Sequence, residues 1–290
     1  MNPLIVTGTG GQVGGAVARQ AMDKYETIGT FRNRRPQLEC RTEEIDLLNL
    51  ESIRSLIHET VPSIVVHAAA MTGVDACERE PASANAINKR ATEIIARSCR
   101  EVGAHMVYVS TDYVFDGMKG NYTEEDGVNP LQTYGKTKLA GEESVRQSLP
   151  DSSTIVRTSV VFDSISQNFV TWLVDAMSKK ESVTVIDDQY ITPTHASDLA
   201  RKILMLVEME KIGIWNVACN DRLNRFDFAK SISERFGFDT KKLKRGKMSE
   251  MPWTAVRPRD SSLCTEKLSG IIEPIDTRRA IDMVFCELEN

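Results

Sequence analysis

The segment Y-G-K-T-K at residues 134–138 contains two side chains that together could transfer a proton. On a helix, Lys138 lies one turn beyond Tyr134 on the same face, whereas Lys136 points elsewhere. A phenol titrates at about pH 10, and a neighbouring ammonium favours its ionised form. Y-x-x-x-K also arises by chance on solvated helices. The chemical interpretation therefore depends on whether other segments converge on the same place.

Short apolar runs alternate with helical patterns in the first part of the chain. Strands are predicted at 4–6, 26–30, 63–67, 105–110 and 154–157, and helices at 12–22, 52–59, 82–101 and 134–148. This order predicts an α/β fold, a Rossmann-type doubly wound parallel sheet with helices on both faces.

The alternation loosens after about residue 160. Helices are predicted at 168–179, 196–209 and 225–236, and strands at 183–186 and 214–217 could still extend the sheet. We expect a dinucleotide-binding domain at 1–160, to which the chain returns at about 183–218. Residues 161–182 and 219–290 are expected to form a smaller C-terminal substrate-binding lobe.

A glycine-rich turn, T-G-T-G-G-Q-V-G at residues 7–14, joins the first strand to the first helix. Glycines here allow a tight turn and let a pyrophosphate approach the helix N-terminus. The spacing is Gly8-x-x-Gly11-x-x-Gly14, and glycines alone often mark only a turn. Their position in a βαβ unit favours dinucleotide binding. The predicted contacts are Gly8, Gly10, Gly11, Gln12, Val13 and Gly14.

The second strand ends in T-F-R-N-R-R, where an NAD-binding unit usually carries an acidic residue. Guanidinium groups of Arg32 and Arg34 could instead pair with a 2′-phosphate. A solvated basic turn is the alternative. The sequence favours NADP (NADPH) and leaves NAD open. Asp46 could accept from the adenine amino group or cap the following helix, and its neighbour Leu47 is a further cofactor candidate.

Two more strands end in segments that suit a ligand. Ala68, Ala69 and Ala70 leave room for a flat ligand, although simple packing explains an alanine run nearly as well. We expect His67 to be a hydrogen-bonded core residue. The next strand ends in S-T-D-Y-V-F-D-G at 110–117. Because ligands bind beyond the carboxyl ends of parallel strands, Thr111 and Tyr134 should converge with the glycine turn. The interpretation of Tyr134 as a proton-transferring residue activated by Lys138 is then favoured.

Together these motifs resemble the extended short-chain dehydrogenase/reductase superfamily, and within it the dTDP-4-dehydrorhamnose reductase family. The superfamily resemblance rests on T-G-x-x-G-x-x-G, the alanine run, S-T-D-Y-V-F-D-G and Y-G-K-T-K-L-A-G-E. The family resemblance also uses R-T-S at 157–159, D-Q-Y-I-T-P-T at 188–194 and R-P-R-D-S-S-L at 257–263. It runs over nearly the whole chain.

The resemblance implies a mechanism. Tyr134 would give a proton to a ketone oxygen as hydride arrives from the nicotinamide, and Lys138 would bind the nicotinamide ribose and favour the tyrosinate. Thr111 would donate to the reacting oxygen, and Asn88 would help to organise the site. The implied reaction reduces the 4-keto group of dTDP-6-deoxy-L-lyxo-4-hexulose to give dTDP-L-rhamnose. The candidate substrate contacts are Asp112, Tyr113, Val160 and Arg257.

Two positions depart from that family. Val160 stands where the family usually has a tryptophan, and His67 where it usually has an asparagine. His67 and F-R-N-R-R-P at 31–36 also resemble the regulatory β subunit of methionine adenosyltransferase. Such a protein binds NADP and a methionine adenosyltransferase catalytic subunit without needing turnover. A different nucleotide-sugar reductase or epimerase of the superfamily is a third interpretation.

The composition limits the remaining function classes. A net charge of −5 over 290 residues argues against a general nucleic-acid binder. No apolar stretch approaches the roughly 20 residues that span a bilayer, and no secretion signal is recognised. The six cysteines are far apart and are expected to be reduced and mostly buried, and the four histidines lack metal-ligand spacing. We expect a cytoplasmic protein without a metal, and a homodimer stays open.

Overall fold

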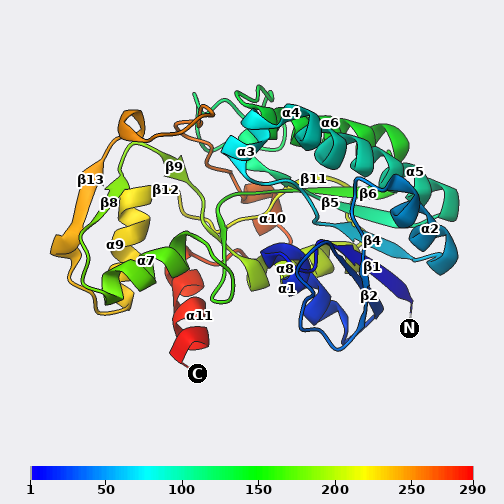
Figure 1. The fold of residues 1–290 in the computed structure, drawn as a ribbon, viewed down its shortest axis with the longest axis horizontal. Helices are drawn as coiled ribbons and strands as arrows, with labels where there is room; N and C mark the ends of the chain where they lie inside the picture. Colours follow the sequence, from blue (N-terminus) through cyan, green and yellow to red (C-terminus); the bar gives the residue numbers. More distant parts are fainter. Residues whose placement is uncertain (1, 290) are drawn as a thin grey trace.

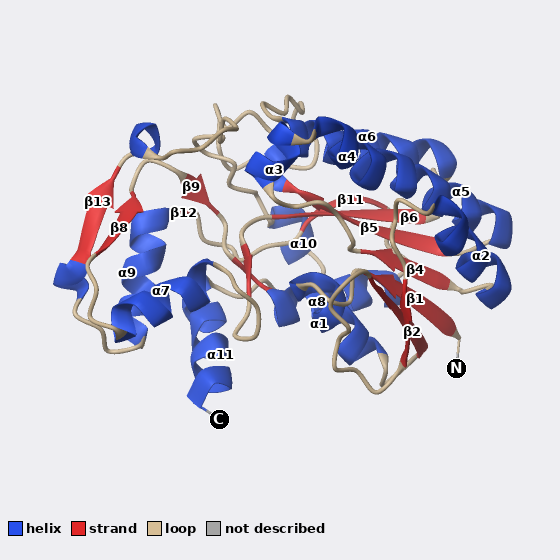
Figure 2. Cartoon of the chain, in the orientation of Figure 1, coloured by secondary structure: helices blue, strands red, loops and turns tan. Residues whose placement is uncertain are grey.

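A seven-stranded parallel sheet forms the centre of the chain in this computed structural model, which describes residues 2–289 (Figures 1 and 2). The strand order is β11-β6-β5-β4-β1-β2-β3, and every pair in it is parallel. The strands are β1 (Pro3–Thr7), β2 (Glu26–Phe31), β3 (Arg41–Glu44), β4 (Ile64–His67), β5 (His105–Thr111), β6 (Ser153–Thr158) and β11 (Gly213–Asn216). The Rossmann-type prediction is confirmed.

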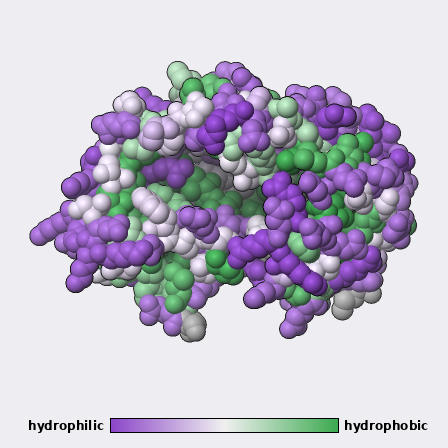
Figure 3. Space-filling view, in the orientation of Figure 1, coloured by the Kyte–Doolittle hydropathy of each residue, from purple (hydrophilic) through white to green (hydrophobic). Residues whose placement is uncertain are grey.

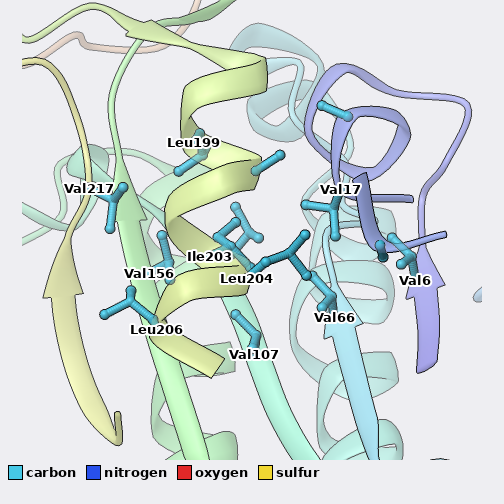
Figure 4. Close-up of a cluster of buried hydrophobic side chains, with 14 of the residues drawn as sticks. Val6, Val17, Val66, Val107, Val156, Leu199, Ile203, Leu204, Leu206 and Val217 are labelled. Carbon is cyan, nitrogen blue, oxygen red and sulfur yellow. The ribbon is translucent and has the colours of Figure 1, made fainter. Parts of the chain in front are cut away.

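Helices cover both faces of the sheet. One face packs on α1 (Gln12–Ala21) and α8 (Ala196–Glu208), and the other on α2 (Leu50–Thr60), α5 (Thr92–Val102) and α6 (Thr133–Ser148). Side chains alternate along a strand, so Leu4 and Val6 enter the first core while Ile5 enters the second. Figure 4 shows Val66, Val107 and Val156 beside Ile203 and Leu204 of α8, and Val6 beside Val17 of α1. Each fully buried aliphatic side chain contributes roughly 1.5–3 kcal/mol.

The helix predicted at 82–101 is present, but it contains a wider turn. It begins as α4 (Pro81–Asn85), continues as a π-helical turn η1 (Ala86–Ala91) and ends as α5. A short helix α3 (Val74–Arg79) precedes it. π-turns inside helices occur frequently at functional sites.

The rest of the chain forms a lobe with its own apolar core. Its main elements are α7 (Phe169–Ser178), β8 (Val183–Ile186), α9 (Arg225–Arg235), β13 (Leu243–Gly246) and α11 (Thr277–Glu289). The expected extension of the central sheet by residues 183–186 was wrong, because β8 pairs with β13 in a separate two-stranded sheet. Val183 and Val185 point into the core of the lobe instead. The chain rejoins the central domain through α8 and β11.

Short elements complete the description. They are η2 (Asp112–Val114), β7 (Val161–Phe162), β9 (Tyr190–Ile191), β10 (Thr194–His195), β12 (Leu223–Asn224), η3 (Thr240–Lys242), η4 (Met248–Glu250) and α10 (Glu266–Ser269). Within residues 2–289, no helix combines the length and apolar character needed to cross a bilayer.

A buried ion pair ties α6 to the sheet. Glu142 accepts from Nε of Arg157 at 3.0 Å and from Nη2 at 2.8 Å, and the two side chains are 0% and 3% exposed. Ser110 donates to the same carboxylate at 2.5 Å. Removing one partner of a buried pair leaves an uncompensated charge, so this contact strongly constrains the position of α6.

We expect Glu142→Gln to lower the free energy of unfolding by about 3–5 kcal/mol, because Arg157 would stay charged and buried without a counter-charge. Urea denaturation would measure the loss. As a control, Asp175→Asn breaks the exposed pair with Lys179 and should change stability little. Equal losses in the two variants would contradict this role of the buried pair.

Candidate active site

The glycine turn connects β1 to α1 and packs against the alanine run that follows β4. Gly8 has a φ of +75°, and a Cβ there would lie 2.8 Å from the backbone of Ala69. A Cβ at Gly14 would lie 2.4 Å from the carbonyl oxygen of Gly8. The amide nitrogen Nε2 of Gln12, at the first position of α1, is buried without a hydrogen-bond partner. This close-packed turn with an unpaired donor fits a pyrophosphate at a helix N-terminus.

The other turn residues have different surroundings. Gly11 is the N-cap of α1, and no side chain caps the helix there. Val13 packs against the core. A Cβ at Gly10 would lie 2.6 Å from the carbonyl oxygen of Arg34. The contact at Gly10 brings the basic turn beside the glycine turn. Arg32, Arg34 and Arg35 are exposed and form no ion pair with any residue of 2–289. They are therefore available for a 2′-phosphate.

Asp46 and Leu47 have local structural partners. Asp46 is exposed, and its Oδ1 accepts from the backbone N–H of Leu48 at 3.0 Å, in the turn before α2. The Leu47 side chain is buried in the core. Asp46 therefore does not cap α2, whose N-cap is Asn49, and cofactor contacts by Asp46 and Leu47 stay predictions.

His67 is a fully buried residue at the end of β4. Its Nδ1 lies 2.7 Å from Oγ1 of Thr7 and its Nε2 lies 3.1 Å from Oγ1 of Thr92. Thr7 also accepts from the amide of Ala69 at 3.1 Å, which fixes the start of the alanine run. Burial, together with the charge of Lys138, lowers the pKa of His67 to about 3. This histidine therefore stays neutral and joins three segments, as expected for a core residue.

Lys138 is fixed beneath the carboxyl end of β5. Its Nζ donates to the carbonyl of Val109 at 2.7 Å and lies 4.0 Å from the ring centroid of Tyr108. The side chain is buried, and burial lowers its pKa to about 7, although the carboxylate of Glu142 opposes this shift. A lysine held in this way can hydrogen-bond a ligand that lies over the ends of the strands.

Tyr134 stands in the first turn of α6, beside Thr111 and Tyr113. Removal from water raises the pKa of its phenol, and a hydrogen bond with Thr111 opposes that shift. Asp112, Cys77 and Tyr113 raise the pKa further. Lys138 is not among these principal influences, so in the protein by itself the phenol stays protonated. The ring meets Tyr113 edge to face, with the centroids 6.1 Å apart.

Asn88 lies in the π-turn and connects three segments. Its side chain accepts from the amide of Met71 at 2.8 Å and donates to the carbonyl of Met71 at 3.1 Å. It also donates to Oγ1 of Thr137 on α6, at 3.1 Å. Asn88 therefore holds the segment after the alanine run against the helix that carries Tyr134 and Lys138, which agrees with an organising role.

The four predicted substrate residues occupy different environments. Asp112 is 3% exposed, and its carboxylate accepts from Thr111, Ser159 and Ser261. Tyr113 lies beside Tyr134, and Val160 has a φ of 41°, which is strained for a β-branched residue. Arg257 is 10% exposed and pairs with Asp75 of α3 at 2.7 Å. Asp112 thus lies beneath the site, whereas Arg257 joins the lobe to α3.

Residues that the sequence did not single out also line this region. Gln189 is 1% exposed and donates to the carbonyl of Pro258, and Arg225 donates to Gln189 at 2.6 Å. Gln189 belongs to D-Q-Y-I-T-P-T, which was the available signal, but Arg225 carried none. Figure 3 shows a hollow with apolar side chains between the two parts of the molecule. The described residues contain no cluster of three His, Cys, Asp or Glu side chains suited to a metal.

The glycine turn, the buried lysine and the tyrosine beside a threonine meet at the carboxyl edge of a Rossmann sheet. This combination defines an extended short-chain dehydrogenase/reductase, a class of nicotinamide-dependent oxidoreductases.

Comparison with known proteins places the chain within that class. The family model described as the RmlD substrate binding domain matches residues 1–289, and the chain belongs to this family. A dTDP-4-dehydrorhamnose reductase of Sinorhizobium fredii is 33% identical over 91% of this chain and 90% of the relative. The methionine adenosyltransferase 2 subunit beta of Mus musculus is 30% identical over 92% of this chain and 82% of its own length.

A solved structure agrees in detail. The dTDP-4-dehydrorhamnose reductase of Bacillus anthracis, in complex with NADP, has a TM-score of 0.89 and 28% identity to this chain. The match covers 99% of both chains. The similarity therefore includes the lobe as well as the sheet.

Because the pKa of Lys138 is lowered in the folded protein, the free energy of unfolding should depend on pH. Between about pH 7 and pH 10.5, Lys138 is protonated in the unfolded chain but not in the folded chain. The contribution of Lys138 to the free energy of unfolding therefore rises with pH. Lys138→Met removes the titration. We expect the difference in unfolding free energy to move in favour of the wild type by about 2 kcal/mol from pH 7 to pH 9.

Denaturant unfolding at several pH values would measure this difference. Lys136→Met, an exposed position on the same helix, is the matched control and should show no such trend. A Lys138→Met difference that stays constant with pH would show that the ammonium is not strongly desolvated.

Proposed function

We propose that this protein is an NADPH-dependent reductase that converts the 4-keto group of dTDP-6-deoxy-L-lyxo-4-hexulose into the hydroxyl of dTDP-L-rhamnose. The main support is that Thr111, Tyr134 and Lys138 lie at the carboxyl end of β5, at the same sheet edge as the glycine turn that follows β1. The family membership and the NADP-bound relative support the cofactor.

The protein's own groups suit the proton-transfer half of this reaction. NADPH, when bound, supplies the hydride. The raised pKa of Tyr134 keeps its phenol protonated, which a proton donor requires. Its Oη would give the proton to the sugar oxygen while Thr111 holds that oxygen. Lys138 would hydrogen-bond the nicotinamide ribose from its position under Val109 and favour the tyrosinate formed by that transfer.

The lobe would bind the nucleotide sugar. We keep the division into a dinucleotide-binding domain and a substrate-binding lobe, with residues 183–186 now assigned to the lobe. Arg257 and Tyr113 face the join between the two parts and are the proposed diphosphate and sugar contacts. Val160 offers a smaller apolar surface than an indole, so the sugar would be held less by stacking.

A regulatory role is the second candidate. His67 at the end of β4 and the Phe31–Pro36 segment resemble the methionine adenosyltransferase β subunit, and the mouse protein is 30% identical to this chain. In that case the site would bind NADP without turnover, and the partner would be a methionine adenosyltransferase catalytic subunit. Another nucleotide-sugar reductase or epimerase is the third.

An NADPH-oxidation assay with epimerised dTDP-4-keto-6-deoxy sugar separates these candidates. Turnover that yields dTDP-L-rhamnose, identified by NMR, supports the reductase. Tight NADPH binding without oxidation, together with capture of a methionine adenosyltransferase, supports the regulatory subunit. Turnover only with other sugar nucleotides supports the third.

Tyr134→Phe removes the transferable proton but keeps the ring. We expect about a 10²-fold or greater loss of kcat with nearly unchanged NADPH binding, as is usual for loss of a general acid. Stopped-flow oxidation and fluorescence titration would measure the two quantities. The control is Tyr25→Phe, which alters a tyrosine packed against the core beside α1 and α8. Unchanged turnover in Tyr134→Phe would remove this residue from the mechanism.

Arg32→Ala should weaken binding of NADPH far more than binding of NADH, because a guanidinium group pairs with the 2′-phosphate that only NADPH carries. Dissociation constants for the two cofactors, measured by calorimetry, give the comparison. A parallel loss for both would mean that Arg32 does not read the phosphate.

A further inference from the structure

The carboxylate of Asp112 connects the catalytic strand to the lobe. Its Oδ1 accepts from the hydroxyl of Thr111 at 3.1 Å. Its Oδ2 accepts from Ser159, which follows β6, at 2.8 Å and from Ser261 of the lobe at 2.5 Å. Both serines are buried, at 1% and 0% exposure. Three hydroxyl donors from three separate segments thus converge on one buried acid.

Ser261 belongs to a segment, residues 257–263, that we call the strap. The strap packs closely on the loop after Asp112, since a Cβ at Gly117 would lie 2.6 Å from Pro258 and one at Gly120 would lie 2.2 Å from Asp260. The backbone N–H of Asp260 donates to the carbonyl of Gly117 at 3.1 Å. The position of Ser261 is therefore fixed by the close packing of its strap neighbours and by the Asp260 backbone hydrogen bond, and its hydroxyl donates to Asp112.

The hydroxyl of Thr111 has one proton and competing acceptors. The backbone N–H of Tyr113 donates to its oxygen at 3.2 Å, so the proton is free to point elsewhere. If it points at the phenol oxygen of Tyr134 it stabilises a phenolate, and if it points at Asp112 it does not. The negative charge of Asp112 also disfavours the phenolate. Both effects of Asp112 keep Tyr134 in its protonated form.

We propose that Asp112 is a positioning residue that, before the substrate binds, directs the Thr111 hydroxyl to itself and keeps Tyr134 protonated. The strap holds Asp112 in this state through Ser261, and the Thr111 hydroxyl turns to the sugar oxygen when that acceptor arrives. The role in turnover rests on the proposed reductase function. Asp112 touches no reacting atom and acts through Thr111 and Tyr134. Through Ser261, the lobe thereby helps to determine the protonation state of Tyr134.

The charged and titratable groups around Asp112 agree with this role. Burial raises the pKa of Asp112, and the hydroxyls of Ser261, Ser159 and Thr111 oppose the rise in that order. Arg225 from α9 also favours the carboxylate. Tyr113 and Tyr134 face it as neutral phenols whose pKa values it raises.

The neighbouring serines of the strap provide a matched pair of variants. Ser262 is also fully buried, but its hydroxyl donates to Asp260 at 2.6 Å and makes no hydrogen bond with Asp112. In ¹³C NMR titrations of the Asp112 carboxyl group, assigned with Asp112→Asn, we expect Ser261→Ala to raise the titration midpoint by roughly one pH unit. Ser262→Ala should leave it unchanged. Equal shifts, or none in Ser261→Ala, would overturn the link to the strap.

Kinetics test the link to Tyr134. Asp112→Asn should move the alkaline limb of the kcat profile for NADPH-dependent reduction to lower pH by roughly one unit, because the phenol ionises more easily without the carboxylate. A loss of kcat without a shift of the limb would mean that Asp112 is only structural. If the wild type reduces no sugar nucleotide, the proposed function fails, and the NMR comparison still decides the contact between Ser261 and Asp112.

Discussion

The ammonium of Lys138 is held at the carboxyl end of β5 by the Val109 carbonyl and the face of Tyr108. This contact requires α6 to lie close against the sheet, and the buried pair of Glu142 and Arg157 secures it there. The charge of Glu142 also partly offsets the lowering of the Lys138 pKa that burial causes. The first turn of the same helix carries Tyr134. One set of buried charges therefore determines where both the ammonium and the phenol lie.

The parallel sheet brings the other parts of the site to the same edge. β1 ends in the glycine turn, β4 in the alanine run and β5 in Thr111, and these strands are neighbours in the order β5-β4-β1. His67 fixes this edge because its two ring nitrogens are hydrogen-bonded to Thr7 and Thr92, so neither is left unpaired. The strap then joins the lobe to Asp112. The cofactor side is thus built on strands, and the substrate side is added through loop contacts.

The sequence predicted the central domain well because buried parallel strands are nearly continuous apolar runs. It missed β3, whose residues R-T-E-E lie at the sheet edge and are not apolar. It placed β8 in the wrong sheet because a short apolar run does not reveal its partner. The sequence also did not predict the roles proposed for Asp112, Ser261 and Arg225. These roles depend on contacts between the central domain and the lobe, made by residues more than one hundred positions apart. Tyr134 and Lys138 were accessible because they are close in sequence.

A crystal structure with NADP bound would show whether α6 places Lys138 and Tyr134 at the nicotinamide. We expect the pyrophosphate at the glycine turn, the Lys138 Nζ at hydrogen-bond distance from the nicotinamide ribose, and the Tyr134 Oη facing the nicotinamide ring. A nicotinamide bound away from Tyr134, or a phenol turned out of the crevice, would contradict it.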